Sequence, residues 1–225
     1  MARILKDIYS DVEISSFLGF KGGTAAYLFH NLPRFSVDLD FDLINNSEDL
    51  EKTKKLIFHK IGTTLKKYGI VKEKRIKRWT IFFLLSYGGA DHNIKIEIST
   101  RRHNNEYEIK KYLGIAMLAA KKETLFANKL VALTGRKNIA MRDVYDICFF
   151  ARNNWDIDER IISFWTDKKL KSYLGECARK LEKINDRAIL QGLGEVLEEK
   201  DKMWAKDNLK KETTFLLKNY QKSLS

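Results

Sequence analysis

The chain has 225 residues, of which 44% are hydrophobic and 12% aromatic, so a disordered, collagen-like or small disulfide-scaffold protein is excluded. Lysine and arginine number 42 against 30 aspartates and glutamates, which gives a formal net charge of +12. A charge of this size favours a polyanionic partner without indicating which one, although lysine-rich, solvated helices account for it equally well.

Signals for export and membrane insertion are missing from the sequence. The N-terminal stretch MARILKDIYSDVEI has acidic residues where a signal peptide needs an unbroken apolar run. The longest strongly apolar stretch, residues 79–86, is too short to cross a bilayer. Two cysteines, Cys148 and Cys177, have no CxxC neighbour, which indicates reduced, structural thiols. We therefore expect a cytoplasmic protein with no membrane segment.

The first half of the chain has the pattern of a mixed α/β domain. Strands are predicted at residues 17–21, 37–43, 79–86, 93–99 and 114–119. The third and fourth of these flank the sequence YGGADH, which is typical of a hairpin turn. Helical periodicity covers residues 24–31 and 50–68, and Ser47 is the predicted N-cap of the second helix.

Beyond residue 120 the alternating strand pattern nearly disappears and helical periods replace it. Helices are predicted at residues 121–134, 142–153, 157–174, 175–199 and 203–223. We therefore predict an α+β fold: a mixed β-sheet with flanking helices in residues 1–119, followed by a C-terminal α-helical bundle in residues 120–225. In this interpretation the helical domain closes a cleft over the sheet domain.

Three aspartates lie in an alternating segment. In RFSVDLDFD, residues 34–42, strand geometry places Asp38, Asp40 and Asp42 on one face. Three like charges repel one another unless a cation or basic groups compensate them. Such oxygen ligands suit Mg²⁺ or Mn²⁺, which use one or two carboxylates and leave positions for water and phosphate. The open alternative is a solvated edge strand whose acidic residues prevent aggregation.

Two further motifs flank the aspartates. Gly22 and Gly23 follow a predicted strand and begin a helix, where backbone N–H groups can bind a phosphate. Downstream, the alternation of residues 94–98 turns Glu97 away from the apolar face. If its strand neighbours the aspartate strand, Glu97 can join Asp38 and Asp40 as a third carboxylate. An ordinary half-exposed strand glutamate is the alternative.

The order of these motifs resembles a known family. GFKGGTAA at 19–26, followed by RFSVDLDF at 34–41, is similar to the AbiEii/MenT group of nucleotidyltransferase-like toxins, within the DNA polymerase β-type nucleotidyltransferase superfamily. ANKL at 127–130 and RDVYD at 142–146 resemble the family's C-terminal lysine and RDxxD motifs. The resemblance covers residues 17–150 and implies a metal-dependent enzyme that moves a nucleoside monophosphate from an NTP to an acceptor hydroxyl.

The resemblance also implies roles for single residues. Asp38, Asp40 and Glu97 would hold Mg²⁺ (or Mn²⁺) and act as catalytic carboxylates. Lys129 and Asp146 would be the other catalytic residues. The implied nucleotide- and phosphate-binding residues are Lys21, Gly22, Gly23, Thr24, Arg34, Ser36 and Arg142.

Some of these residues also have a structural interpretation. Under strict alternation, Arg34 and Ser36 share the face of Asp38, where Arg34 would either bind substrate or pair with a carboxylate. Asp143, a further candidate, shares one helix face with Asp146 through its i, i+3 spacing. A structural ion-pair network between two packed helices is the alternative to a catalytic role there.

The biology that the resemblance implies is that of a toxin in a toxin–antitoxin or abortive-infection system. An NTP would be the substrate, tRNA the acceptor and a cognate antitoxin the protein partner. Two alternatives stay open: a non-catalytic nucleotide- or RNA-binding protein of the same fold, and an interaction module whose acidic strand binds a basic antitoxin. Only residues 1–16 precede the first predicted strand, so we expect the N-terminal helices of longer members to be largely missing.

Overall fold

The computed structural model of the chain describes residues 1–44, 49–88 and 93–224 and consists of two compact units. The sheet unit comprises Met1–His30, Ser36–Arg102 and Tyr107–Ala120. The helical unit comprises Asn31–Phe35, His103–Glu106 and Lys121–Ser225. Neither unit is one continuous stretch, because two short segments of the first half of the chain belong to the helical unit.

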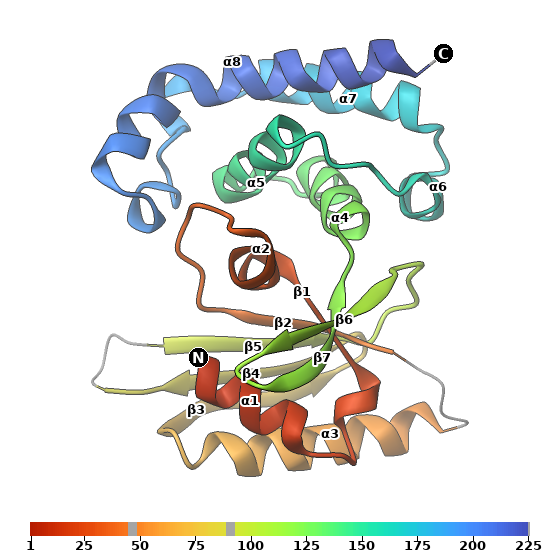
Figure 1. Ribbon diagram of the computed structural model, residues 1–225, viewed down its shortest axis with the longest axis vertical. Helices are drawn as coiled ribbons and strands as arrows, with labels where there is room; N and C mark the ends of the chain where they lie inside the picture. Colours follow the sequence, from red (N-terminus) through yellow and green to blue (C-terminus); the bar gives the residue numbers. More distant parts are fainter. Residues whose placement is uncertain (45–48, 89–92, 225) are drawn as a thin grey trace. The chain divides into compact units, whose positions relative to one another are not determined.

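A seven-stranded mixed sheet forms the centre of the sheet unit (Figure 1). Its strands are β1 (Leu18–Lys21), β2 (Leu39–Leu43), β3 (Ile70–Lys77), β4 (Thr80–Ser86), β5 (Asn93–Ser99), β6 (Tyr107–Tyr112) and β7 (Ile115–Ala120). Their order is β3-β4-β5-β2-β1-β7-β6, and β2 with β5 and β1 with β7 are parallel pairs. β4 and β5 are antiparallel, as the predicted hairpin requires, although its turn residues 89–92 lie outside the described ranges.

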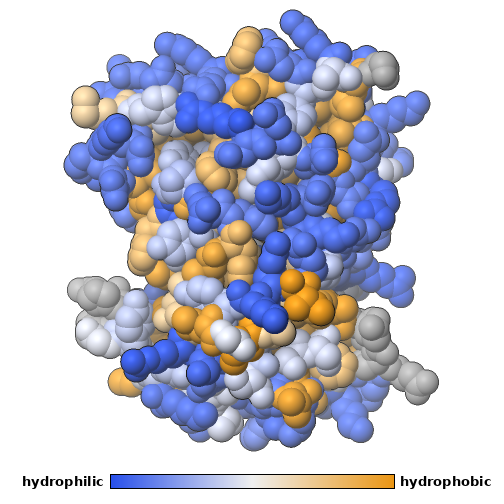
Figure 2. All heavy atoms as spheres, viewed as in Figure 1, coloured by the Kyte–Doolittle hydropathy of each residue, from blue (hydrophilic) through white to orange (hydrophobic). Residues whose placement is uncertain are grey.

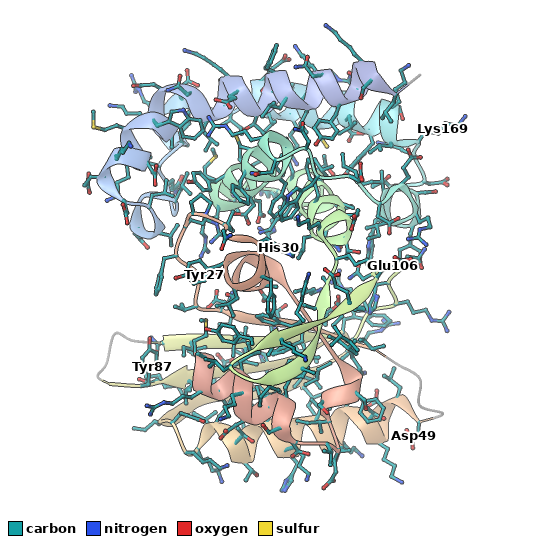
Figure 3. All side chains as sticks on the ribbon, viewed as in Figure 1. Tyr27, His30, Asp49, Tyr87, Glu106 and Lys169 are labelled. Atoms are coloured by element: carbon teal, nitrogen blue, oxygen red, sulfur yellow. The ribbon has the colours of Figure 1, made fainter. Side chains whose placement is uncertain are left out.

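Three helices accompany the sheet: α1 (Ala2–Ser10), α2 (Gly22–His30) and α3 (Leu50–Leu65). Figure 1 shows α1 and α3 on one face of the sheet, while α2 packs against β1 and β2. The predicted N-cap Ser47 lies outside the described residues. Asp49, labelled in Figure 3 at the start of α3, caps this helix, because its Oδ1 accepts a hydrogen bond from the backbone N–H of Lys52 at 3.0 Å.

The core of the sheet unit lies between the sheet and the pair α1 and α3. It is formed by the alternate apolar residues of the central strands, which are fully or almost fully buried: Leu18, Phe20, Leu39, Phe41, Leu43, Ile81, Phe83, Leu85, Ile94, Ile96 and Ile98. Successive strand residues point to opposite faces, so the polar residues between them share the other face. This second face carries the predicted carboxylates of β2 and β5.

Five helices form the helical unit: α4 (Lys122–Gly135), α5 (Met141–Arg152), α6 (Glu159–Thr166), α7 (Leu170–Glu182) and α8 (Glu199–Ser223). Together with the mixed sheet, they confirm the predicted α+β class and the C-terminal bundle. Figure 2 shows that mostly hydrophilic side chains cover the drawn surface over α7 and α8. No helix among the described residues is long and apolar enough to cross a membrane.

The predicted helices at 157–174 and 175–199 are wrong in their bounds. The first is interrupted because Asp167 adopts a left-handed conformation, with φ of +56°, and ends α6. Residues 170–182 form α7, and two short 3₁₀ turns, η2 (Asp186–Ala188) and η3 (Gly194–Val196), occupy part of the chain before α8.

Polar contacts explain why two short segments of the first half belong to the helical unit. Glu106, labelled in Figure 3, forms ion pairs with Lys121 at 2.8 Å and with Arg160 at 2.6 Å. In the other segment, the backbone N–H of Phe35 donates to the carbonyl of Val196 at 2.9 Å. Both segments are therefore held by residues of the helical unit.

Candidate functional site

Two predicted carboxylates lie side by side in the sheet. β2 and β5 are parallel neighbours, and their register pairs Asp40 with Glu97. Paired residues of adjacent strands point to the same face, so both half-buried side chains stand on the face opposite the apolar core. The two strands are therefore neighbours, which is the condition under which Glu97 can join the aspartates.

Asp38 occupies a different kind of position. The strand begins only at Leu39, so Asp38 belongs to the preceding irregular segment. Its Oδ1 accepts a hydrogen bond from the backbone N–H of Lys95 at 3.4 Å, and its Oδ2 lies 3.5 Å from the Lys95 Nζ. The carbonyl of Asp38 also accepts a hydrogen bond from the hydroxyl of Thr24. Asp38 is therefore held next to β5 and tied to the beginning of α2.

The glycine turn lies directly against one of the carboxylates. Gly22 has a φ of +78°, and a Cβ added there would fall 2.6 Å from Oδ2 of Asp40. Only glycine combines this backbone conformation with so close an approach. Gly22 and Gly23 begin α2, whose first backbone N–H groups have no partner within the helix, and Thr24 Oγ1 lies 2.9 Å from Ser36 Oγ. A glycine turn at the beginning of a helix thus lies against a half-buried aspartate.

Asp42 has a different environment from Asp40, although both lie on β2. The residue is only 1% exposed, and its side chain forms an ion pair with Lys21. The hydroxyl of Tyr107 donates to Oδ2 of Asp42 at 2.7 Å. The ion pair and the hydrogen bond offset the cost of burying this carboxylate. The ammonium of Lys21, predicted to bind phosphate, is engaged with Asp42 in the structure.

The acidic residues fit a metal that completes its shell with other ligands. Among the described residues, no three histidines, cysteines, aspartates or glutamates gather closely enough to hold an ion by themselves. Mg²⁺ usually takes one or two protein carboxylates and fills its remaining positions with water and substrate phosphate. Asp40 and Glu97, beside the turn at Gly22, match that requirement.

A second cluster of charged residues lies within the helical unit, and its members are Arg34, Lys129, Arg136, Asp143 and Asp146. Arg34 binds Asp146 through two bonds, Nε to Oδ1 at 2.5 Å and Nη2 to Oδ2 at 2.8 Å. Nζ of Lys129 lies 2.6 Å from Oδ1 of Asp143 and 2.8 Å from Oδ2 of Asp146. Arg136 completes the cluster by pairing with Asp143.

Burial and charge act in opposite directions on this cluster. Desolvation favours the neutral forms, but Lys129 and Arg34 outweigh it and hold the pKa of Asp146 below its ordinary value. In the same way, desolvation lowers the pKa of Lys129, but the nearby Asp146 and Asp143 bring it above its ordinary value. Desolvation also opposes the charge of Arg34, but the nearby Asp146 raises the pKa of Arg34 above its ordinary value. All three side chains are therefore ionised near neutral pH.

The placement of Arg34 and Ser36 differs from the prediction. Both were expected on one strand face with Asp38, but residues 33–38 are not part of a strand, so the alternation does not apply to them. Of the two predicted alternatives for Arg34, the structure shows the ion pair, formed with Asp146 of α5. Arg142 is exposed and forms no ion pair with any other residue in the described ranges.

The predicted residues thus form two sets, each assembled within its own unit. The sheet unit holds Lys21, Gly22, Gly23, Thr24, Ser36, Asp38, Asp40 and Glu97, and the helical unit holds Arg34, Lys129, Arg142 and Asp146. Sequence reasoning missed Tyr107, Lys95 and Arg136. No spacing rule connects these residues to their partners, which lie on other elements.

Comparisons with known proteins agree with this architecture. A family model described as nucleotidyl transferase AbiEii toxin, type IV toxin–antitoxin system, matches residues 3–216. A presumed nucleotidyltransferase from Helicobacter pylori is 21% identical, with a TM-score of 0.63 over 99% of this chain and 93% of its own. JHP933 from Helicobacter pylori is 22% identical, with a TM-score of 0.64 over 99% of this chain and 90% of its own. At these identities the two structures show a shared fold, and no curated protein matches the chain.

Proposed function

We propose that this chain, which belongs to the AbiEii family of nucleotidyltransferase toxins, transfers a nucleoside monophosphate from an NTP to a hydroxyl of tRNA. Family membership makes the protein a nucleotidyltransferase of the toxin kind, with an NTP substrate and a cognate antitoxin. To this we add the acceptor, the metal and the roles of individual residues.

The contact between Asp40 and the Gly22 turn carries the proposal. A carboxylate that touches a glycine turn at a helix N-terminus brings a ligand for a cation next to donors for a phosphate. Glu97 stands beside Asp40 in the register, which provides the second carboxylate.

The residues of the sheet unit divide the reaction between them. Asp40 and Glu97, with Asp38, would hold Mg²⁺, which when bound neutralises charge that develops on the phosphoryl oxygens. Backbone N–H groups at Gly22 and Gly23 donate to phosphate oxygens. The acceptor hydroxyl gives its proton to Glu97 while its oxygen bonds to the α-phosphorus. The bond from this phosphorus to the bridging oxygen breaks, and pyrophosphate leaves.

The charged cluster of the helical unit supports a role for Lys129. Two carboxylates keep its ammonium protonated, and Asp146 is in turn fixed by Arg34. The five side chains of the cluster carry three positive and two negative charges. We propose that Lys129 is a catalytic cation of the transferase and that Asp146 positions its ammonium.

A tRNA acceptor is supported by the charge of the whole chain. The formal net charge of +12 attracts a polyanion at long range and releases counterions from its phosphates on binding. A protein hydroxyl as acceptor would require no such charge.

The test is transfer of label from each of the four α-labelled NTPs to purified total tRNA in the presence of Mg²⁺. Asp40→Asn and Glu97→Gln keep the shape of each side chain and remove its charge, so we expect rates lower by at least about 100-fold. Glu108→Gln, which removes a partly exposed carboxylate from edge strand β6, is the matched control and should keep full activity.

Each outcome of this test decides something. Label on tRNA that depends on Asp40 and Glu97 supports the transferase and identifies the donor base. Label on an added protein instead of tRNA overturns the acceptor but keeps the chemistry. NTP that binds without release of pyrophosphate, under all conditions, would point to the non-catalytic binder of the same fold.

A further inference from the structure

A strongly basic segment of the sheet unit has no role in the mechanism above. β3 is an edge strand of the sheet, and the stretch of residues 72–78, KEKRIKR, contains five basic residues and one glutamate. Most of these side chains are exposed. Edge strands often carry lysines that block aggregation, but that purpose does not call for arginines and an exposed tryptophan beside them.

The strand register connects this edge to the carboxylates. One row of paired residues runs across the sheet from Arg75 through Phe82 and Glu97 to Asp40. Paired residues share a face, so the guanidinium of Arg75 stands on the same face as Asp40, three strand spacings or about 14 Å away. Lys77, in the next row, lies on this face as well. A few nucleotides of an extended strand span such a distance.

The turn after β3 extends the basic surface along one end of the sheet. Trp79 is 43% exposed, and the guanidinium carbon of Arg78 lies 4.9 Å from the centre of its ring. The backbone N–H of Thr100 donates to the carbonyl of Trp79 at 3.0 Å, which brings the end of β5 beside this turn. Exposed Arg101 and Arg102 follow Thr100 directly. An exposed indole among arginines suits stacking on a nucleic-acid base.

One cation of this surface, Arg75, pairs with Glu73, whereas four others are not compensated within the described part of the chain. Lys77, Arg78, Arg101 and Arg102 form no ion pair with any residue of the described part of the chain. Four uncompensated cations around one exposed tryptophan, on a sheet that presents a carboxylate pair, favour an anionic partner of extended shape.

We propose that this basic strip, defined as Arg75, Lys77, Arg78, Trp79, Arg101 and Arg102, binds the phosphate backbone of the RNA acceptor and leads its reacting end to the carboxylates. The inference rests on the proposed function for the identity of the RNA. Arginine and lysine bind phosphates without regard to sequence, so the strip positions the acceptor and leaves the choice of base to other contacts. NTP binding does not involve the strip.

The experiment compares two variants with the same net charge. The strip variant carries Lys77→Gln, Arg78→Gln, Arg101→Gln and Arg102→Gln. The control variant replaces four exposed lysines of the helical unit, Lys171→Gln, Lys200→Gln, Lys206→Gln and Lys211→Gln. Binding of labelled total tRNA is measured at several salt concentrations, together with NTP binding and the KM and kcat for tRNA.

We expect the strip variant to bind tRNA at least about tenfold more weakly, with a salt slope reduced by about 3, whereas the control stays near wild type. KM for tRNA should rise while NTP binding is unchanged. Equal losses in both variants overturn the proposal, because net charge alone would then explain them. Unchanged tRNA binding combined with weaker binding of an acidic protein partner also overturns it.

Two readings keep this result separate from the proposed function. Wild-type protein that binds tRNA through the strip but transfers no label supports the docking surface and refutes the reaction. Label transfer that is unaffected in the strip variant supports the reaction and refutes the docking surface. If the fourfold variant does not fold by circular dichroism, the double variant Arg101→Gln/Arg102→Gln, outside any strand, gives the same comparison with half the effect on the salt slope.

Discussion

Removal of the charge of Asp146 should lower the unfolding free energy of the helical unit by more than the removal of an exposed charge does. The Asp146→Asn substitution keeps the size of the side chain but leaves Arg34, whose side chain is 3% exposed, and Lys129 without their shared carboxylate. Loss of one partner from a buried ion pair costs about 3–5 kcal/mol of unfolding free energy. For a chain of this length that corresponds to a melting temperature lower by about 6–20 °C.

Urea unfolding followed by tryptophan fluorescence suits this measurement. Trp155, Trp165 and Trp204 belong to the helical unit, and only Trp79 belongs to the sheet unit, so most of the signal reports on the unit that contains Asp146. Asp207→Asn is the matched control, because it removes an exposed aspartate from α8 and should change stability by less than about 0.5 kcal/mol.

A double-mutant cycle separates the ion pair from general damage. Arg34→Ala and Asp146→Ala should each destabilise the protein, and the double variant should be more stable than the sum of the two losses predicts, by about 0.5–3 kcal/mol. A loss below about 1 kcal/mol for Asp146→Asn, or two losses that simply add, would refute the view that Asp146 is the centre of the cluster.

Three further predictions concern the turn, the buried aspartate and acid. Gly22→Ala should abolish label transfer and destabilise the protein more than Gly114→Ala does. Gly114 has the same φ of +78° but open space around it, so its substitution has only the backbone cost of about 1–2 kcal/mol. Equal effects of the two substitutions on urea unfolding would contradict the contact between Gly22 and the carboxylate of Asp40. Tyr107→Phe removes the hydroxyl that donates to Asp42 and should lower the unfolding free energy by about 1.5–3 kcal/mol, and a change below about 0.5 kcal/mol would rule this bond out as a stabilising one. Burial opposes ionisation of Asp146, but its two basic partners hold its pKa below the ordinary 3.8. The ionised form therefore stabilises the fold above that pH, and this stabilisation is lost as the pH falls below it. Unfolding curves between pH 2 and 7 should show a smaller acid-dependent loss of unfolding free energy in Asp146→Asn than in wild type, and an identical pH dependence would argue against the lowered pKa.

The strands that the sequence does not predict are the two at the edges of the sheet. β3 and β6 are each paired on one side only, and both are rich in charged residues, so neither has a regular apolar face. Ile109 of β6 is even 70% exposed. The central strands β2, β4 and β5 alternate clearly because one of their faces is buried, and their prediction is confirmed. Helix α1 is also missed, although Ile4, Leu5 and Ile8 lie on one helical face.

The candidate site was predictable where it depends on local geometry. The alternation of residues in β2 and β5 is sufficient to place Asp40 and Glu97 away from the core, and the glycine pair marks the beginning of α2. Arg34 was not predictable, because its partner Asp146 is 112 residues away and local alternation suggested a strand that begins only at Leu39. Interactions between distant segments are set by tertiary packing, which a single sequence does not display.

The segment Asn31–Phe35 has a consequence for how this protein could be divided. Its contacts belong to the helical unit, although it joins α2 to β2 in the middle of the sheet unit. A fragment cut after Ala120 would carry Arg34 away from Asp146, and the remaining fragment would retain a buried carboxylate that lacks its arginine. Segments of the two units alternate along the chain, so neither unit can be replaced as one continuous segment. Insertion or deletion between α2 and β2 would disturb the glycine turn, the aspartates and the bundle in a single step.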